Sequence, residues 1–154
     1  MKTKSLKLMT LAALVTSIGM VGCKKEAELI TDSAALPCDY FTQDRVLQDN
    51  PDVDVDYVIG CDMIVSADIT VMPGTKIEFK TDAGIQVLET GSFNAVGTQV
   101  QPILMSGVDQ TPGSWRGIYI DSNDSKNKFE HCAITYAGGT AHNSNGDQGT
   151  FVLW

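Results

Sequence analysis

From Tyr57 onward, short segments in which apolar and polar residues alternate make up most of the chain. Ile77 and Phe79, for example, are separated by the charged residue Glu78. A period of two is that of a half-buried β-strand, and no segment after Tyr57 sustains the 3.6-residue period of a helix. Gly, Asp, Asn or Pro separates the segments, and turn residues at this density are typical of an all-β chain. The predicted strands are 63–65, 69–71, 76–79, 85–87, 93–96, 103–105, 117–120 and 133–136.

The segments also repeat in order. Residues 69–77 contain an apolar triplet, a Pro-Gly turn and a further apolar residue, and residues 85–93 repeat this order with Thr-Gly in the turn. Three short strands therefore form one unit of roughly 20 to 25 residues, which is a period typical of solenoids. A single unit cannot bury its own inward residues, whereas stacked units can.

Four consecutive segments resemble the repeats of right-handed parallel β-helix proteins. The resemblance runs from about residue 57 to residue 139 and implies a short right-handed parallel β-helix. Such domains occur in many surface lipoproteins, and the fold by itself says little about function. Residues 68–79 resemble the pattern L-T-I-x-P-G-T-x-I-x-F, residues 91–103 resemble G-S-L-x-A-x-G-T followed by P-I, residues 113–118 resemble G-x-W-x-G-I, and residues 131–139 resemble C-x-I-x-Y-A-G.

The first 23 residues have the order of a secretory signal. Three lysines precede an uncharged apolar run at residues 8–20, which is shorter than the about 20 residues that a membrane-spanning helix needs. The tetrapeptide Met20-Val21-Gly22-Cys23 resembles the lipobox of bacterial lipoproteins, which implies cleavage before Cys23 and attachment of lipid to it. Lys24 follows in place of the aspartate that often retains lipoproteins at the inner membrane, and Lys24-Lys25-Glu26 is similar to a surface-export tag. The resemblance implies a lipid-anchored protein of the outer membrane, with exposure at the cell surface left open.

These features divide the chain into four parts. We expect a signal peptide at residues 1–22, the lipidated cysteine with a flexible tether at 23–37, an N-terminal cap segment at 38–56, and the β-helix domain at 57–154. The cap segment is compatible with either a short helix or a strand. Residues 151–154 have the character of a new strand without a polar cap, so we expect the β-helix to be incomplete at its C-terminus. Two explanations stay open: the chain is a truncated piece of a larger adhesin-like solenoid, or its last rung associates with a partner chain, including a second copy.

Three cysteines follow Cys23 in the mature chain. An oxidising compartment permits a disulfide, and Cys38 and Cys61 flank the acidic N-terminal segment in polar sequence. We therefore predict a Cys38–Cys61 bond. Cys132 is two residues before Ile134, so their side chains lie on the same face of the predicted strand. This predicts a free, buried Cys132 side chain.

The mature chain is strongly acidic. All 19 acidic residues lie after Cys23, against 8 of the 11 basic ones, so the net charge of the mature chain is −11 with histidine neutral. This charge excludes nucleic acid as a partner.

Asp52, Asp54 and Asp56 are the candidates for a weak calcium site. They do not begin an EF-hand, because that loop needs Gly at its sixth position and Glu at its twelfth, where this chain has Tyr57 and Met63. In an extended strand their carboxylates would share one face at about 7 Å spacing. The alternative is a solvated strand face.

Trp115, Tyr119 and Tyr136 are candidate ligand contacts, because aromatic rings stack on sugar faces. The alternative for Trp115 is the architectural tryptophan of the G-x-W-x-G-I pattern. We interpret the two histidines, His131 and His142, as surface residues rather than general bases. The loop residues Asp121, Asn123, Asp124 and Asn127 are explained by turn formation.

The sequence carries no motif for catalysis or for a cofactor. We find no nucleophile elbow, Gly-rich phosphate loop or HExxH, and no pair of carboxylates that we can nominate for glycoside hydrolysis. With about three rungs and only Arg45 and Arg116 as arginines, the chain also lacks the basic groove of a polysaccharide lyase. We predict a non-catalytic binding or structural role toward glycans or another surface protein. A polysaccharide lyase or hydrolase is the alternative.

Overall fold

The computed structural model describes residues 35–153, in which short strands are joined by turns and loops. A single turn of 3₁₀ helix, η1 (Tyr40–Thr42), is the helical element of this part of the chain. No helix within it has the length and hydropathy needed to cross a membrane. The strands are β1 (Ala35–Leu36), β2 (Arg45–Leu47), β3 (Tyr57–Ile59), β4 (Asp62–Val65), β5 (Asp68–Val71), β6 (Lys76–Phe79), β7 (Gly84–Val87), β8 (Ser92–Val96), β9 (Ile103–Gly107), β10 (Gly117–Ile120), β11 (Lys128–Glu130), β12 (Cys132–Thr135) and β13 (Phe151–Leu153).

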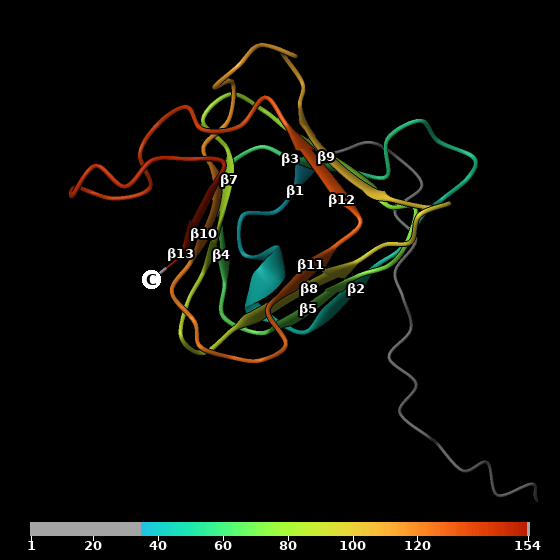
Figure 1. Ribbon diagram of the computed structural model, residues 1–154, viewed down its shortest axis with the longest axis horizontal. Coiled ribbons are helices and arrows are strands. Elements are labelled where there is room, and N and C mark those ends of the chain that lie inside the picture. The colour runs from blue at the N-terminus through green and yellow to red at the C-terminus, as the bar shows by residue number, and fades with distance from the viewer. Residues whose placement is uncertain (1–34, 154) are drawn as a thin grey trace, which may run out of the picture.

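The strands form three parallel sheets that are wound by one continuous path. Sheet A has the order β1-β3-β6-β9-β12, sheet B the order β2-β5-β8-β11, and sheet C the order β4-β7-β10-β13. From β3 onward each coil of chain visits sheets A, C and B in turn, so each strand pairs with the one three places later. The sheets outline a triangle when viewed along the stack (Figure 1). This arrangement confirms the predicted all-β, β-helix-like solenoid, with three complete coils in β3–β11.

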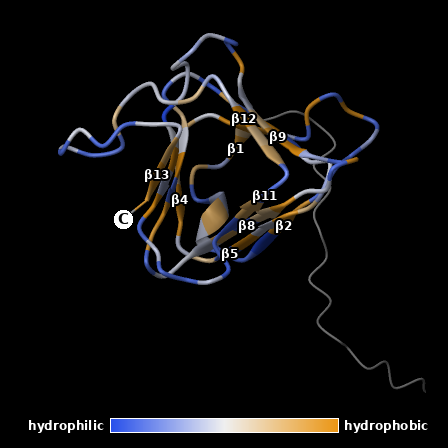
Figure 2. Ribbon diagram, viewed as in Figure 1, coloured by the Kyte–Doolittle hydropathy of each residue, from blue (hydrophilic) through white to orange (hydrophobic). Residues whose placement is uncertain are grey.

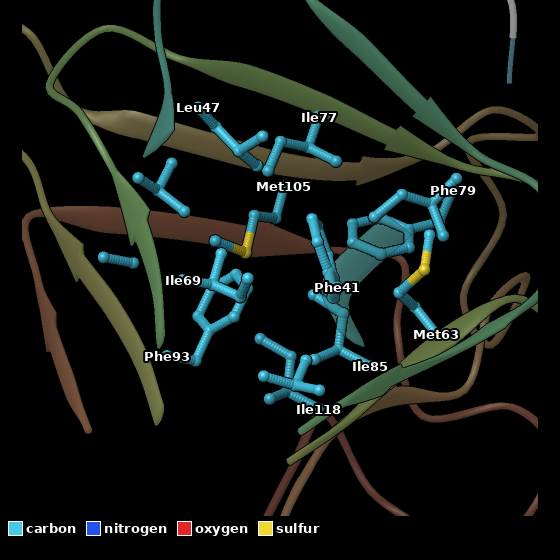
Figure 3. Close-up of a cluster of buried hydrophobic side chains, with 14 of the residues drawn as sticks. Phe41, Leu47, Met63, Ile69, Ile77, Phe79, Ile85, Phe93, Met105 and Ile118 are labelled. Atoms are coloured by element: carbon cyan, nitrogen blue, oxygen red, sulfur yellow. The ribbon is translucent and has the colours of Figure 1, made fainter. Parts of the chain in front are cut away.

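The alternation of residue types explains the register of the sheets. In sheet C, Met63 lies beside Ile85, Ile85 beside Ile118, and Ile118 beside Phe151. The same stacking of apolar residues in the other sheets fills the interior (Figure 3). Ile69, Ile77 and Val87, the positions that the alternation directs inward, are all buried as predicted. Hydrophobic residues therefore lie along the strands, while hydrophilic ones concentrate in the loops at the corners (Figure 2).

The stacking begins before residue 57. β1 pairs with β3 and β2 pairs with β5, so residues 35–47, which the sequence divides between a tether and a cap, belong to a first, partial coil. Both structures left open for the cap segment occur there, a short helix and a strand. Phe41 of η1 is fully buried, and its ring meets the Phe93 ring edge-on with centroids 6.2 Å apart. Its carbonyl accepts a hydrogen bond of 3.2 Å from the Ser66 N–H. The helix lies inside the triangle of sheets and closes the first end of the core (Figure 1).

The cysteines pair as predicted. Cys38 and Cys61 form a disulfide with their Cα atoms 6.0 Å apart, which links the start of the first coil to the turn between β3 and β4. Cys132 is free, also as predicted. It is half-buried rather than buried, because β12 is the last strand of sheet A and nothing in the described residues stacks beyond it.

Residues 151–153 form a strand, as the sequence predicts. β13 pairs with β10, and the loop between β12 and β13 brings it to a new coil.

Candidate functional site

A groove runs along the corner at which the chain passes from sheet B to sheet A. Residues 48–56, 72–75 and 97–102 make this corner in three successive coils. Between these segments lie two adjoining hollows of about 420 and 470 Å³, which share Asp49 and Gln101. Together they are lined by Gln48, Asp49, Pro51, Val53, Asp54, Met72, Pro73, Gly74, Lys76, Val100, Gln101, Pro102 and Leu104. We call this surface the corner groove.

Backbone contacts tie the three segments of the corner groove together. The Gly74 N–H donates to the Gln101 carbonyl at 3.1 Å. Gly74 has φ +88°, a left-handed conformation that favours glycine, and a Cβ there would lie 3.1 Å from the Asp49 carboxylate. The Asp56 carboxylate accepts hydrogen bonds of 2.7 Å from the N–H groups of Asn50 and Lys76. These hydrogen bonds therefore hold the backbone segments of the groove in place.

These bonds overturn the arrangement expected for the calcium candidates. Residues 52–56 form turns and bends instead of an extended strand. Asp56 points inward and is buried, while Asp52 and Asp54 remain exposed. Within residues 35–153, no three acidic, histidine or cysteine side chains gather into a set that could hold a metal ion. The three carboxylates therefore do not form one site.

The corner groove exposes aliphatic surface beside negative charge. Val100 is 90% exposed, and Met72 and Leu104 are also accessible. Asp49 and Asp54 contribute carboxylates, while Lys76 is the one basic residue of the lining. None of the lining residues is aromatic. Such a surface suits an extended ligand with apolar groups and positive charge.

The predicted platform of three aromatic ligand contacts does not form, because the side chains of Trp115 and Tyr119 are buried. Trp115 is fully buried and stacks on Phe79 with ring centroids 3.9 Å apart. Its Nε1–H donates to the Thr135 carbonyl at 2.8 Å. Trp115 therefore has the architectural role that we gave as the alternative to ligand contact. Tyr119 is buried on the outer side of sheet C, and Tyr136 is exposed after the end of β12.

A second cluster of polar residues lies on the outer side of sheet C. Arg116 approaches Asp62 with Nη1 and Oδ2 3.8 Å apart, and its Nη1 donates to the Ala141 carbonyl at 2.7 Å. The His142 ring lies against Tyr119, with centroids 5.6 Å apart. Residues 138–149 thus pack over this side of the sheet. His142 is buried, contrary to our interpretation of it as a surface residue, because this loop folds back; His131 is exposed, as expected.

Burial shifts the titration of two groups in this cluster. It raises the pKa of Asp62, and the nearby Arg116 opposes that rise. It lowers the pKa of His142, because the protonated ring would have to leave water. Asp62 Oδ1 and both His142 ring nitrogens are buried without a hydrogen-bond partner in the described residues. The folded protein therefore favours an uncharged His142.

We expect the loop at residues 138–149 to loosen as the pH falls from about 7 to about 5.5. Because the pKa of His142 is lower in the folded chain than its ordinary 6.5, the unfolded chain takes up the proton first as the pH falls through that value, and stability is lost. The raised pKa of Asp62 acts in the opposite direction, at lower pH, where the folded chain takes up its proton first. Hydrogen exchange of the loop measures the effect. His142→Gln should flatten this pH dependence and His131→Gln should not; equal profiles in all three proteins would contradict the expectation.

The loop after β10, which is rich in aspartate and asparagine, forms a turn, in line with our interpretation of the sequence. Asn127 Oδ1 accepts from the Phe93 N–H at 2.8 Å, and its Nδ2 donates to the Ser122 carbonyl at 3.0 Å. Asp124 Oδ1 accepts from the Lys126 N–H at 2.8 Å. Asn127 thus links the loop to β8, while Asp124 stabilises a turn within the loop.

Sequence reasoning missed the corner groove, although one signal was available. Three of the five prolines, Pro51, Pro73 and Pro102, recur at the same corner of successive coils. Recurring prolines mark turns that stack, and stacked turns of unequal length leave hollows between them.

Comparison of the chain with protein-family models, with curated proteins and with solved structures found no match. The function must therefore be argued from the residues themselves.

Proposed function

We propose that this chain is a lipid-anchored binding protein of the bacterial cell envelope, built on a short right-handed parallel β-helix. Its corner groove binds an extended segment of another surface protein. The observation that carries the proposal is the continuity of the groove across three coils. Neighbouring strands lie about 4.8 Å apart, so the three corners span about 10 Å along the stack, or about three residues of extended peptide.

The lining of the groove favours a peptide over a glycan. Protein sites for sugars use exposed aromatic rings, and the candidate ring of Trp115 is buried. The groove offers instead valine, leucine, methionine and proline side chains. Its carboxylates, in a mature chain of net charge −11, favour a partner segment that carries lysine or arginine.

The anchor rests on the lipobox at residues 20–23, which lies outside the described residues. Lipid on Cys23 would hold the domain at the outer membrane, and Lys24-Lys25-Glu26 supports export to the cell surface. Two or more acyl chains give stable anchoring. Labelled palmitate should enter the wild-type protein and not the Cys23→Ala variant; equal labelling would rule the anchor out.

Selection from a library of random heptapeptides tests the binding role, with a glycan array run on the same protein. We expect the selected peptides to combine aliphatic residues with lysine or arginine, and to bind less tightly as salt rises. Val100→Asp should weaken binding of a selected peptide by at least about tenfold, because it places a charge in the apolar part of the groove. Val108→Asp is the matched control, since Val108 is exposed at another corner. Selection of glycans without peptides, or an equal loss in both variants, would contradict the proposal.

A further inference from the structure

The loop between β12 and β13 has a tight turn at its tip. The His142 N–H donates to the Asp147 carbonyl at 2.8 Å, and inside this pair the Gly146 N–H donates to the Asn143 carbonyl at 3.2 Å. The Asn143 side chain also belongs to the turn, since its Oδ1 accepts from the Asn145 N–H at 3.0 Å and its Nδ2 donates to Asp147 Oδ2 at 2.6 Å. Hydrogen bonds of both its backbone and its side chain thus hold Asn143 in place.

Asn145 belongs to the same turn but is held differently. Its backbone N–H is bonded to Asn143, while the residue itself is exposed to water. The next residue, Gly146, is also exposed and has φ +85°. A Cβ placed on Gly146 would have no atom within 4 Å apart from those of its neighbours in the chain. Asn145 and Gly146 therefore form an asparagine–glycine pair on an open part of the surface.

An asparagine followed by glycine can lose its amide nitrogen without an enzyme. The Gly146 backbone nitrogen attacks Cγ of Asn145, a new C–N bond closes a succinimide ring, and the bond from Cγ to Nδ2 breaks. Ammonia leaves with the proton that the backbone nitrogen gives up. Water then opens the ring. Cleavage of the bond between the ring nitrogen and Cγ gives aspartate, and cleavage of the bond between the ring nitrogen and the backbone carbonyl carbon gives isoaspartate.

We infer that Asn145 is a site of spontaneous deamidation in the folded protein. Of the six asparagines in the sequence, it is the one that glycine follows, and glycine leaves the attacking nitrogen uncrowded by a Cβ. The reaction has to break the hydrogen bond from Gly146 to Asn143, which at 3.2 Å is at the long end of the normal range. By contrast, Asn127 is held at both ends of its side-chain amide, and Asn94 lies within β8.

Deamidation changes the turn in two ways. Both products place a new carboxylate two residues before Asp147, in a mature chain that already carries −11. In isoaspartate the backbone also runs through Cβ and Cγ, which adds one backbone atom between residues 145 and 146. This extra atom shifts Gly146 and Asp147 relative to Asn143 and His142, the residues with which they form backbone hydrogen bonds.

The effect reaches sheet C through His142. The His142 ring is buried and lies against Tyr119, with centroids 5.6 Å apart. Loss of the hydrogen bond between His142 and Asp147 removes a contact that positions this ring, so isoaspartate formation should release the loop from sheet C. Because hydrolysis does not restore the amide, the change runs in one direction and marks the age of the molecule. The inference does not depend on the proposed function, since the corner groove lies between sheets B and A.

Incubation of the folded protein in neutral buffer, followed by peptide mapping with mass spectrometry, tests the inference. We expect the mass gain of deamidation in the peptide that contains Asn145 before it occurs at any other asparagine, and a protein isoaspartate methyltransferase should label the same peptide. Gly146→Ala should slow the reaction by at least about tenfold, because a side chain crowds the attacking nitrogen. Earlier reaction of another asparagine, or an unmodified Asn145 in folded protein when the urea-unfolded chain reacts, would overturn the inference.

A second variant separates the effect of the turn from that of the local sequence. Ser144→Gly places a glycine after Asn143, whose side chain is held by the hydrogen bonds of the turn. In this variant Asn143 should react at least about tenfold more slowly than Asn145, because its amide must first leave the turn. Equal rates at the two asparagines would show that the turn does not select the site, and would likewise overturn the inference.

Hydrogen exchange measures the release of the loop. The isoaspartate fraction of aged protein, separated by ion-exchange chromatography, should exchange the His142 amide at least about fivefold faster than fresh protein does. Asn145→Asp gains the charge without the extra backbone atom and should show a smaller increase. Asn145→Gln should show no change with age. Equal exchange of the His142 amide in the fresh protein and in the isoaspartate fraction would refute the release of the loop.

Discussion

Replacing Ile77 with aspartate should leave the chain unfolded. Ile77 lies on β6 in the middle of sheet A, where it is 1% exposed and stacks between Tyr57 and Met105. A carboxylate at this position must either lose its hydration or take up a proton, at a cost of several kcal/mol. A domain of this size has a total stability of about 5–15 kcal/mol. The substitution damages the contacts of β6 with both neighbouring coils, so the loss cannot be confined to one strand.

Far-UV circular dichroism and urea denaturation measure this loss. Gln86→Asp is the matched control, because Gln86 lies on the outward side of β7 and is partly exposed. It should retain the β-sheet spectrum and a urea midpoint close to that of the wild type. A cooperative, native-like transition in the Ile77→Asp protein would show that the interior is not packed as described.

Trp115→Ala should lower the free energy of unfolding by about 3–5 kcal/mol. The indole ring is fully buried against Phe79, and its N–H satisfies the carbonyl of Thr135 on β12. Alanine would leave both a cavity and a carbonyl without its donor. Trp115→Phe keeps most of the ring but loses the N–H, so it should cost less, with about 1 kcal/mol attributable to the hydrogen bond.

Chemical denaturation of the two variants separates the contributions of packing and of hydrogen bonding to the free energy of unfolding. The same variants also test whether Trp115 has any role in peptide binding. A folded Trp115→Phe variant should bind a selected peptide as the wild type does, since the ring lies away from the corner groove. An unfolding free energy for Trp115→Ala within about 1 kcal/mol of the wild type would contradict the architectural role.

The alternation of residues was sufficient to predict most strands, because inward and outward positions differ sharply in a solenoid. It failed where apolar and polar residues do not alternate over several positions: β3 has three apolar residues in a row, and β11 has only one. β11 contains only Phe129 between two charged residues, and it is a strand because β8 offers it an edge to pair with. η1 was equally hard to specify, because three residues are too few to show a helical period. Its place is set by Phe41, which fills the open end of the core.

The candidate sites were harder to predict than the strands, because they depend on which turns meet. Asp56 belongs to an acidic alternation that favours a solvated face, yet its carboxylate turns inward to accept two backbone N–H groups. His142 lies in a stretch rich in glycine and asparagine, which does not predict burial, and it is buried only because its loop returns to sheet C. The corner groove joins residues 48–54 to residues 100–104, and no local pattern connects them.

The closed first end makes the first part of the solenoid more self-sufficient than the coils above it. In a repeat protein each coil gains much of its stability from its neighbours, and folding can begin wherever the local contacts are strong enough. Residues 35–65 have such contacts, since η1 packs against β4 and the Cys38–Cys61 bond links the start of the first coil to the turn before β4. We therefore expect the backbone amides of these residues to be among the best protected of the described chain in hydrogen exchange.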